Sequence, residues 1–335
     1  MAIQAIESLE NLRSLKDEWL KLWQESSTAT PFQSPDWIIP WWKYFGSGRL
    51  CVLVWRNDAG LLGIAPLFAY DDDRRSLRFI GTGNTDYLDI IVDDRARNDC
   101  GAAIFNYLSN IHSWRDIDLE SLPCNSPLLR TMRDLDLDEE VDARVEEQDA
   151  CPVLSLPRTA TEFIDDLPHR LQHNLSYYRR KLAMCGEVMF EQAVENNFDE
   201  LFEALLSLHK ARWRMTNSKG VLFADDVQSF HRDAAFGLLS HGALRLYSLR
   251  IDGRVIACLY GFHHAQRTYY YLSGFDPEFA QYSPGNILVA HAIHEAIREG
   301  ATEFDFLRGR ESYKYKWGAI DQPIYHKHLT RIENS

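Results

Sequence analysis

The stretch LRLYSLRIDGRVIACLYGF, residues 244–262, predicts a β-hairpin in the second half of the chain. Two apolar runs flank the dipeptide Asp252-Gly253, and Asp-Gly between such runs is a strong signal for a two-residue hairpin turn. Another strand-like run follows at residues 267–273, and apolar positions then recur at helical spacing over residues 287–298. This half of the chain therefore predicts antiparallel strands followed by a helix.

The first half repeats this order. Residues 50–55 and 61–70 are two apolar runs joined by the turn sequence Asn-Asp-Ala-Gly, and a strand-like run at 77–80 precedes a helical pattern at 100–111. We interpret the repeat as a degenerate internal duplication. Hairpins are common, so a chance similarity between the halves is the alternative.

The length of 335 residues suits two domains. The acidic stretch DLDLDEEVDARVEEQDACPVLSLP, residues 134–157, predicts a loop between them, because charge runs followed by prolines are typical of boundaries. We therefore predict units at residues 1–155 and 156–335. Residues 1–23 predict an amphipathic helix without the features of an export signal, and no apolar run is long enough to span a membrane.

Cysteine and histidine spacing predicts no metal site. The six cysteines lie far apart without a C-x-x-C motif, which favours reduced cytoplasmic thiols. His291 and His294 stand three residues apart on a predicted helix, and His326 and His328 share one face of a possible strand. No carboxylate or cysteine completes either pair at a familiar spacing.

Charge is distributed unevenly along the chain. The net charge is −13, and residues 1–150 hold 15 Lys and Arg against 27 Asp and Glu, whereas the remaining residues hold 21 against 22. An acidic protein is a poor general binder of nucleic acid, which needs a basic face. The most basic segment is a predicted helix over residues 171–182, whose charged face is either solvated or available to an anionic ligand.

The sequence SPGN, residues 283–286, opens the predicted helix near the end of the chain. Ser283 suits the N-cap, Pro284 the first helical position and Gly300 the position after the helix. With little side-chain bulk over the first turn, the backbone N–H groups of Gly285, Asn286 and Ile287 are predicted to face an anion. An ordinary capped helix is the alternative.

Five segments together resemble a known family. They are PFQSPDWIIPWWKYFG (31–46), GTGNTDYLDIIV (81–92), the helix at 171–182, SPGN (283–286) and FDFLRGRESYKYKWG (304–318). In this order they resemble the tandem GNAT-type acyltransferases of the group named after a cellulose-biosynthesis protein, relatives of the Fem peptidoglycan aminoacyltransferases. The resemblance covers nearly the whole chain.

The resemblance implies an α/β (α+β) fold with two GNAT-like units, each a mixed, largely antiparallel sheet flanked by helices. It also implies acyl transfer to an amine, such as an amino sugar in surface-polysaccharide synthesis, with acetyl-CoA or another acyl-CoA as co-substrate and no metal. The chain has only one glycine where GNAT enzymes usually have a Q/R-x-x-G-x-G/A loop. The predicted donor contacts are Ser273, Ser283, Gly285, Asn286, Ile287 and Arg308.

The segment FDFLRGRESYKYKWG holds the candidate catalytic groups. Acyl transfer requires a group that takes the amine proton, one that assists the leaving thiolate and one that stabilises charge. Asp305 and Glu311 are the predicted bases, Tyr313 the predicted acid, and Lys314 or Arg308 the predicted charge stabiliser. The alternative is a structural ion pair between Asp305 and Lys314 among core rings.

A second polar cluster, Asp86, Tyr87 and Asp89, is predicted to bind a sugar or ammonium acceptor, with a merely structural turn as the alternative.

We thus predict an acyl-CoA-dependent N-acyltransferase acting on a small or saccharide amine. Aminoacyl transfer from charged tRNA is a second hypothesis, which the acidic composition disfavours. A GNAT-like binding protein without catalytic activity is the third.

Overall fold

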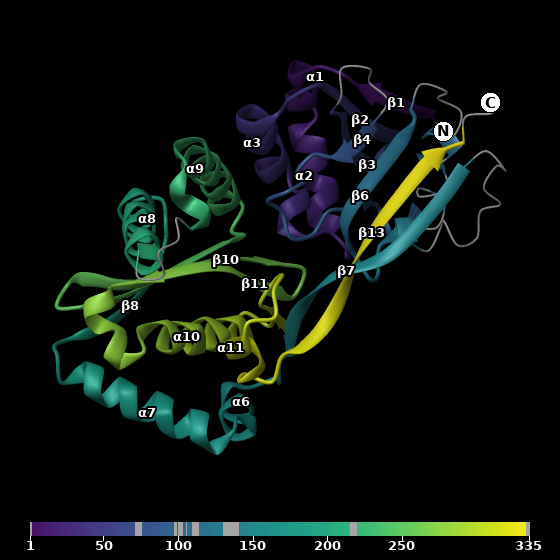
Figure 1. Ribbon diagram of the computed structural model, residues 1–335. Coiled ribbons are helices and arrows are strands. Elements are labelled where there is room, and N and C mark those ends of the chain that lie inside the picture. The colour runs from purple at the N-terminus through teal and green to yellow at the C-terminus, as the bar shows by residue number, and fades with distance from the viewer. Residues whose placement is uncertain are drawn as a thin grey trace. The chain divides into compact units, whose positions relative to one another are not determined.

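The structure is a computed structural model that describes residues 2–70, 76–96, 99, 103–104, 106–108, 114–129, 141–214 and 220–332 (Figure 1). It divides into two compact units. One comprises Met1–Ala150 with Gln322–Ser335, and the other comprises Cys151–Asp321. Among the helices of the described residues, none has the length and apolar character needed to cross a membrane.

The first unit is built on a sheet with the strand order β1-β2-β3-β4-β6-β13. Neighbouring strands are antiparallel except β4 and β6, which are parallel. The elements are β1 (Ala2–Ile6), α1 (Leu9–Ser14), α2 (Lys16–Glu25), η1 (Pro31–Gln33), α3 (Pro35–Phe45), β2 (Arg49–Asn57), β3 (Gly60–Ala69), β4 (Ser76–Phe79), β5 (Ile91–Val92), η2 (Asp94–Ala96), β6 (Asp116–Pro123) and β13 (Ile320–Arg331).

The second unit has the strand order β7-β12-β11-β10-β9-β8, again antiparallel except for the parallel pair β11 and β12. Helices α8 and α9 lie on one side of this sheet and α10 and α7 on the other (Figure 1). The elements are β7 (Val141–Ser155), α6 (Ala160–Asp166), α7 (His169–Ala183), β8 (Val188–Gln192), α8 (Phe198–Arg214), η3 (Val221–Phe223), α9 (Asp225–Ser240), β9 (Leu244–Ile251), β10 (Arg254–His264), β11 (Arg267–Phe275), η4 (Pro277–Tyr282), α10 (Pro284–Arg298), β12 (Glu303–Asp305) and α11 (Ser312–Tyr315).

The two sheets repeat one pattern of pairing, as the predicted duplication requires. In each, a hairpin (β2–β3 or β9–β10) is followed by a third antiparallel strand and then a parallel one. Asp252 and Gly253 have φ angles of 46° and 82°. Positive φ at both central positions gives the turn twist that matches two antiparallel strands. The mixed sheets flanked by helices confirm the predicted fold class.

The structure corrects two local expectations. The predicted N-terminal helix is wrong at its start, because Ala2–Ile6 forms β1 and pairs with β2 before α1 and α2 begin. The predicted acidic loop is wrong over Val141–Ser155, which forms β7. Most of the first nine residues of β7 are exposed, although Val141 and Ala143 alternate with Asp142 and Arg144 and pack against the core of the first unit. The many acidic residues in this stretch concealed that alternation.

The unit boundaries also differ from the expected division at residue 155. The first unit ends at Ala150, and β13 brings the end of the chain back into it from Gln322 onward. The predicted helix at residues 100–111 falls mostly outside the described residues; residues 103–104 and 106–108 are helical.

His231 on α9 lies in the core of the second unit with 1% of its surface exposed. Its ring lies 5.3 Å from that of Tyr271 and 5.9 Å from that of Tyr260. Burial lowers the pKa of His231 from 6.5 to about 3, and burial also lowers the pKa of His209 on α8 to about 4. Both imidazoles are therefore neutral at pH 7 in the folded chain.

We expect the second unit to lose stability as the pH falls below about 6. The unfolded chain takes up a proton on His231 near pH 6.5, while the folded chain takes it up only near pH 3. The stabilisation is therefore complete above pH 6.5 and declines by about 1.4 kcal/mol per pH unit below it. Urea unfolding at pH 7, 6 and 5 measures this slope. His231→Phe should reduce it, and the exposed control His169→Gln should not; equal slopes in all three proteins would contradict the assignment.

Candidate functional site

A pocket of about 250 Å³ opens at the N-terminus of α10 in the second unit. Segments that are distant in the sequence contribute to it: the end of α8, strand β11, η4, the first turn of α10, and α11. Four of its lining residues are predicted donor contacts and one is a predicted catalytic residue. The lining residues are Arg212, Tyr270, Ser273, Phe275, Ala280, Ser283, Pro284, Gly285, Asn286, Val289 and Tyr313.

The first turn of α10 offers backbone donors to this pocket. Pro284 occupies the first helical position as predicted, but Ser283 has left-handed backbone angles and caps no backbone N–H. Its hydroxyl instead accepts a hydrogen bond of 2.8 Å from the Asn286 side chain. The Ile287 N–H donates to the Ser283 carbonyl, which removes it from the predicted anion contacts. The N–H groups of Gly285 and Asn286 are left as the first-turn donors without an acceptor in the helix.

Gly285 leaves the mouth of the pocket open. A Cβ atom at this position would meet only the Phe275 ring, at 4.0 Å. The glycine is therefore not required by close packing. Its effect is to keep side-chain bulk away from the first-turn N–H groups, where a ligand oxygen would approach.

Arg212 and Tyr270 belong to the pocket and were missed by the sequence analysis. The Arg212 guanidinium donates to the Ser273 hydroxyl at 3.1 Å and to the Ser273 carbonyl at 3.2 Å. The Tyr270 hydroxyl lies 2.7 Å from the same Ser273 oxygen. Strand alternation could have separated Tyr270 from Tyr269 and Tyr271, whose side chains point to the other face. Arg212 carried no comparable signal, because basic residues are common in the last turn of a helix.

Tyr313 faces Tyr270 across this pocket. The two rings lie 6.4 Å apart between centroids and meet edge to face. Burial raises the pKa of Tyr313 well above its ordinary value, and the neighbouring Tyr270 hydroxyl raises it further. The phenol is therefore protonated at physiological pH and can donate a hydrogen bond to a bound group.

Lys314 is buried and anchors the loop before α11. Its side chain is 3% exposed, and its ammonium donates to the carbonyls of Leu307, Arg308 and Gly309, each at 2.9 Å. The Glu311 carboxylate, 57% exposed, is its ion-pair partner at 2.9 Å. These contacts use all three N–H groups of Lys314, so the structure gives Lys314 a structural role.

Asp305 is fully buried at the end of β12 and is absent from the pocket lining. Its carboxylate accepts a hydrogen bond of 2.8 Å from the Leu307 N–H and lies 3.3 Å from the Arg267 guanidinium. The alternative interpretation, an ion pair between Asp305 and Lys314, is therefore wrong, because each has different partners. Arg308 is half-buried, and its backbone carbonyl accepts a hydrogen bond from the Lys314 ammonium.

The candidate acceptor residues lie in the first unit. Tyr87 and Asp89 are buried in its interior with 3% exposure each. The Asp89 carboxylate accepts hydrogen bonds from the Ile90 N–H at 2.8 Å and the Ser126 hydroxyl at 2.9 Å. These contacts give the Asp89 carboxylate a structural role in a turn. Asp86 is half-buried.

A larger pocket of about 450 Å³ lies among α6, α7 and α10. Arg179, from the basic face of α7, lines it with Ser176, His291 and Glu295. Burial lowers the pKa of His291 to about 4, so this imidazole is neutral at pH 7. His291 and His294, for which the sequence predicted no metal site, both line this pocket.

Comparison with known proteins bears on the family of the second unit and on the fold of the chain. Residues 169–315 match the family described as acetyltransferase (GNAT) domain. No curated protein matches the chain significantly. The fold is similar to FemX, with a TM-score of 0.65 at 11% identity over 98% of this chain and 97% of that one. It is also similar to the C-terminal domain of a putative lysylphosphatidylglycerol synthetase from Agrobacterium fabrum, with a TM-score of 0.59 at 14% identity over 96% and 92% of the two chains.

We expect Lys314→Met to destabilise the second unit by roughly 3–5 kcal/mol, because three carbonyls and one carboxylate lose their cation. Urea unfolding of the variant measures the loss. Lys316→Met is the matched control, since Lys316 is exposed directly after the same short helix and should change the free energy of unfolding little. A Lys314→Met protein as stable as the control would show that the buried ammonium does not hold the loop.

Proposed function

We propose that the second unit transfers an acyl group from acyl-CoA to an amine. The single observation that carries the proposal is the pocket at the start of α10, where two backbone N–H groups, the Arg212 guanidinium and the protonated Tyr313 hydroxyl line one space. The match of residues 169–315 to a GNAT-type acetyltransferase domain supports it.

The donor pyrophosphate would bind at the N-terminal turn of α10. A helix N-terminus carries about half a positive charge, and its unpaired N–H groups favour phosphate oxygens. Gly285 and Asn286 supply such groups, and Arg212 adds a full positive charge from the opposite wall. The Ser273 hydroxyl, which Arg212 and Tyr270 hold in place, offers a further polar contact.

Tyr313 would assist the leaving group. In the transfer, the amine nitrogen attacks the thioester carbonyl carbon, the new C–N bond forms and the C–S bond breaks. A hydrogen bond from the Tyr313 hydroxyl would stabilise the thiolate as it leaves. The proton that the nitrogen loses then passes through water to this sulfur, giving the amide and free CoA. The described lining residues include no carboxylate, so we assign the proton transfer to water.

The acceptor is proposed to be a small or saccharide amine, such as an amino sugar used in polysaccharide synthesis. The alternative donor is an aminoacyl-tRNA, as in the Fem group. The fold similarity to FemX over nearly the whole chain favours this alternative, whereas the net charge of −13 disfavours a large polyanion.

Gly285→Glu should weaken CoA binding by about tenfold or more, because a carboxylate would project toward the pyrophosphate and repel it. Gly285→Gln adds similar bulk without charge and should weaken binding less. Calorimetric titration with acetyl-CoA measures both, and titration of the parent chain with tRNA tests the alternative donor. Unchanged CoA affinity in a folded Gly285→Glu chain would place the donor elsewhere, and binding of tRNA alone would favour aminoacyl transfer.

Tyr313→Phe should lower kcat by about 10²–10³-fold, the usual effect of removing one donor to a developing negative charge. CoA affinity and Tm should change little, because the ring is retained. Tyr315→Phe is the control: Tyr315 is exposed, and its hydroxyl bonds to Asp321 at 2.7 Å outside the pocket. Equal kcat values in the two variants would remove Tyr313 from the mechanism.

A further inference from the structure

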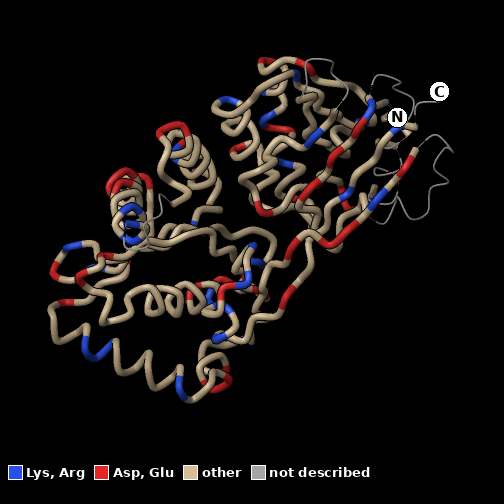
Figure 2. The backbone as a smooth tube through the Cα atoms, in the orientation of Figure 1, with Lys and Arg blue, Asp and Glu red and all other residues tan. Residues whose placement is uncertain are grey.

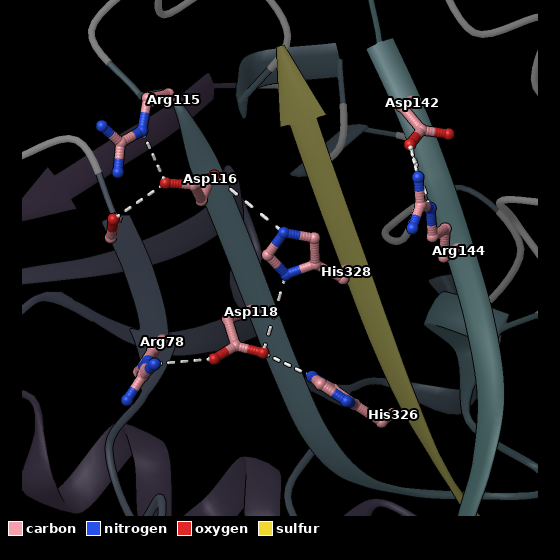
Figure 3. Close-up of polar contacts among 9 residues, drawn as sticks. Arg78, Arg115, Asp116, Asp118, Asp142, Arg144, His326 and His328 are labelled. Carbon is pink, nitrogen blue, oxygen red and sulfur yellow. Dashed lines mark hydrogen bonds and ion pairs between the residues drawn. The ribbon is translucent and has the colours of Figure 1, made fainter.

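Two histidines and an aspartate meet on the first unit. His326 and His328 lie on β13, two residues apart and therefore on the same face of the strand. The neighbouring strand β6 pairs antiparallel with β13 and places Asp118 opposite His328. Figure 3 shows both imidazole rings directed toward the Asp118 carboxylate. The carboxylate that sequence spacing did not supply thus comes from an adjacent strand.

The donor atoms of these three residues lie close to one another. The His326 Nε2 atom contacts Asp118 Oδ1, and the His328 Nδ1 atom lies 3.9 Å from the same oxygen. One nitrogen from each histidine and one Asp118 oxygen all fall within 4.8 Å of one another. Ligand atoms of a tetrahedral zinc ion lie roughly 3.3 Å apart, given bond lengths of about 2 Å. Small rotations of the two half-buried rings would reach that spacing.

Each of the three groups also has an outer partner. The other nitrogen of His326, Nδ1, lies 3.5 Å from Glu146 Oε1 on β7. The other nitrogen of His328, Nε2, lies 3.9 Å from Asp116 Oδ1. Asp118 Oδ2 is held by Arg78 at 2.9 Å. Metal-binding histidines commonly donate their second N–H to a carboxylate, which orients the ring and increases its basicity.

We propose that Asp118, His326 and His328 bind a divalent zinc ion, with water completing the coordination. Two imidazoles and one carboxylate are a typical zinc ligand set, and imidazole ligands disfavour magnesium and calcium. Acidic residues recur along β6 and β7, the strands that carry Asp116, Asp118 and Glu146 (Figure 2). They favour a cation there, whereas Arg78 opposes it.

The ion would fasten the last strand of the chain to the first unit. In the sequence, the whole second unit, Cys151–Asp321, lies between the main part of the first unit and the residues of β13 that belong to it. A metal that links β13 to β6 binds only the folded pairing, so it stabilises that pairing by mass action. Without metal, the same residues form histidine–carboxylate ion pairs, and this is the competing explanation of the cluster.

The test is calorimetric titration of the full chain with zinc chloride after chelator treatment and alkylation of accessible thiols, because exposed cysteines such as Cys124 and Cys185 also bind zinc. We expect one ion per chain. His328→Gln and Asp118→Asn should each weaken binding at least tenfold, and Glu146→Gln should weaken it about 10–100-fold as an outer partner. His169→Gln, an exposed histidine of the second unit, is the control and should bind as the parent does.

A second readout separates zinc binding from ion pairing. Zinc should raise the Tm of the parent and of His169→Gln but not that of His328→Gln. Cobalt(II) bound to the parent should show the visible absorption of a low-symmetry site, and His328→Gln should lack it. Absence of a stoichiometric zinc site in the parent, or equal affinity in the parent and His328→Gln, would overturn the proposal and leave ion pairing as the role of the cluster.

Discussion

The buried ammonium of Lys314 holds together the segment that brings Tyr313 into the pocket at the start of α10. Three successive carbonyls, from Leu307 to Gly309, converge on it. This arrangement requires positive φ angles of 56° at Leu307 and 107° at Gly309. A left-handed angle at leucine costs about 1–2 kcal/mol, which the charge-assisted hydrogen bonds offset. Because Tyr313 precedes Lys314 on the short helix α11, the same contact places the Tyr313 ring beside Tyr270.

Long strands that return from distant sequence impose the second constraint. In the first unit β13 pairs with β6, and in the second unit β7 pairs with β12. The repeated pattern ends with β6 in the first unit and with β12 in the second, and β13 and β7 pair with these two strands. The consequence for function is that β13 carries His326 and His328 to a strand more than two hundred residues earlier in the chain. No local motif could have predicted their common neighbour Asp118.

The sequence predicted those parts of the structure that short-range chemistry determines. The Asp252-Gly253 turn fixed the central hairpin, and Pro284 and Gly300 marked the ends of α10. The pocket residues Gly285 and Asn286 could be predicted from the start of a helix, whereas Ser273 and Tyr313 were predicted from the family resemblance and the chemistry of acyl transfer. Lys314 was not understood, since sequence does not reveal burial of a charge. The helical turn places Lys314 and Trp317 three residues apart and buries both, whereas Tyr315 and Lys316 between them are exposed.

Burial and charge act in opposite directions on Tyr313, and their balance bears on the proposed chemistry. Desolvation raises the pKa of this phenol, whereas the Arg212 guanidinium lowers it. Burial dominates, so the hydroxyl keeps its proton. An anion bound to Arg212 would neutralise the charge that lowers the pKa of Tyr313 and bring a negative group near the phenol, and both effects favour the protonated form. Because the phenol is already protonated at physiological pH, binding of a phosphate-bearing donor would leave Tyr313 as a hydrogen-bond donor, the state that the proposed contact to a leaving thiolate requires.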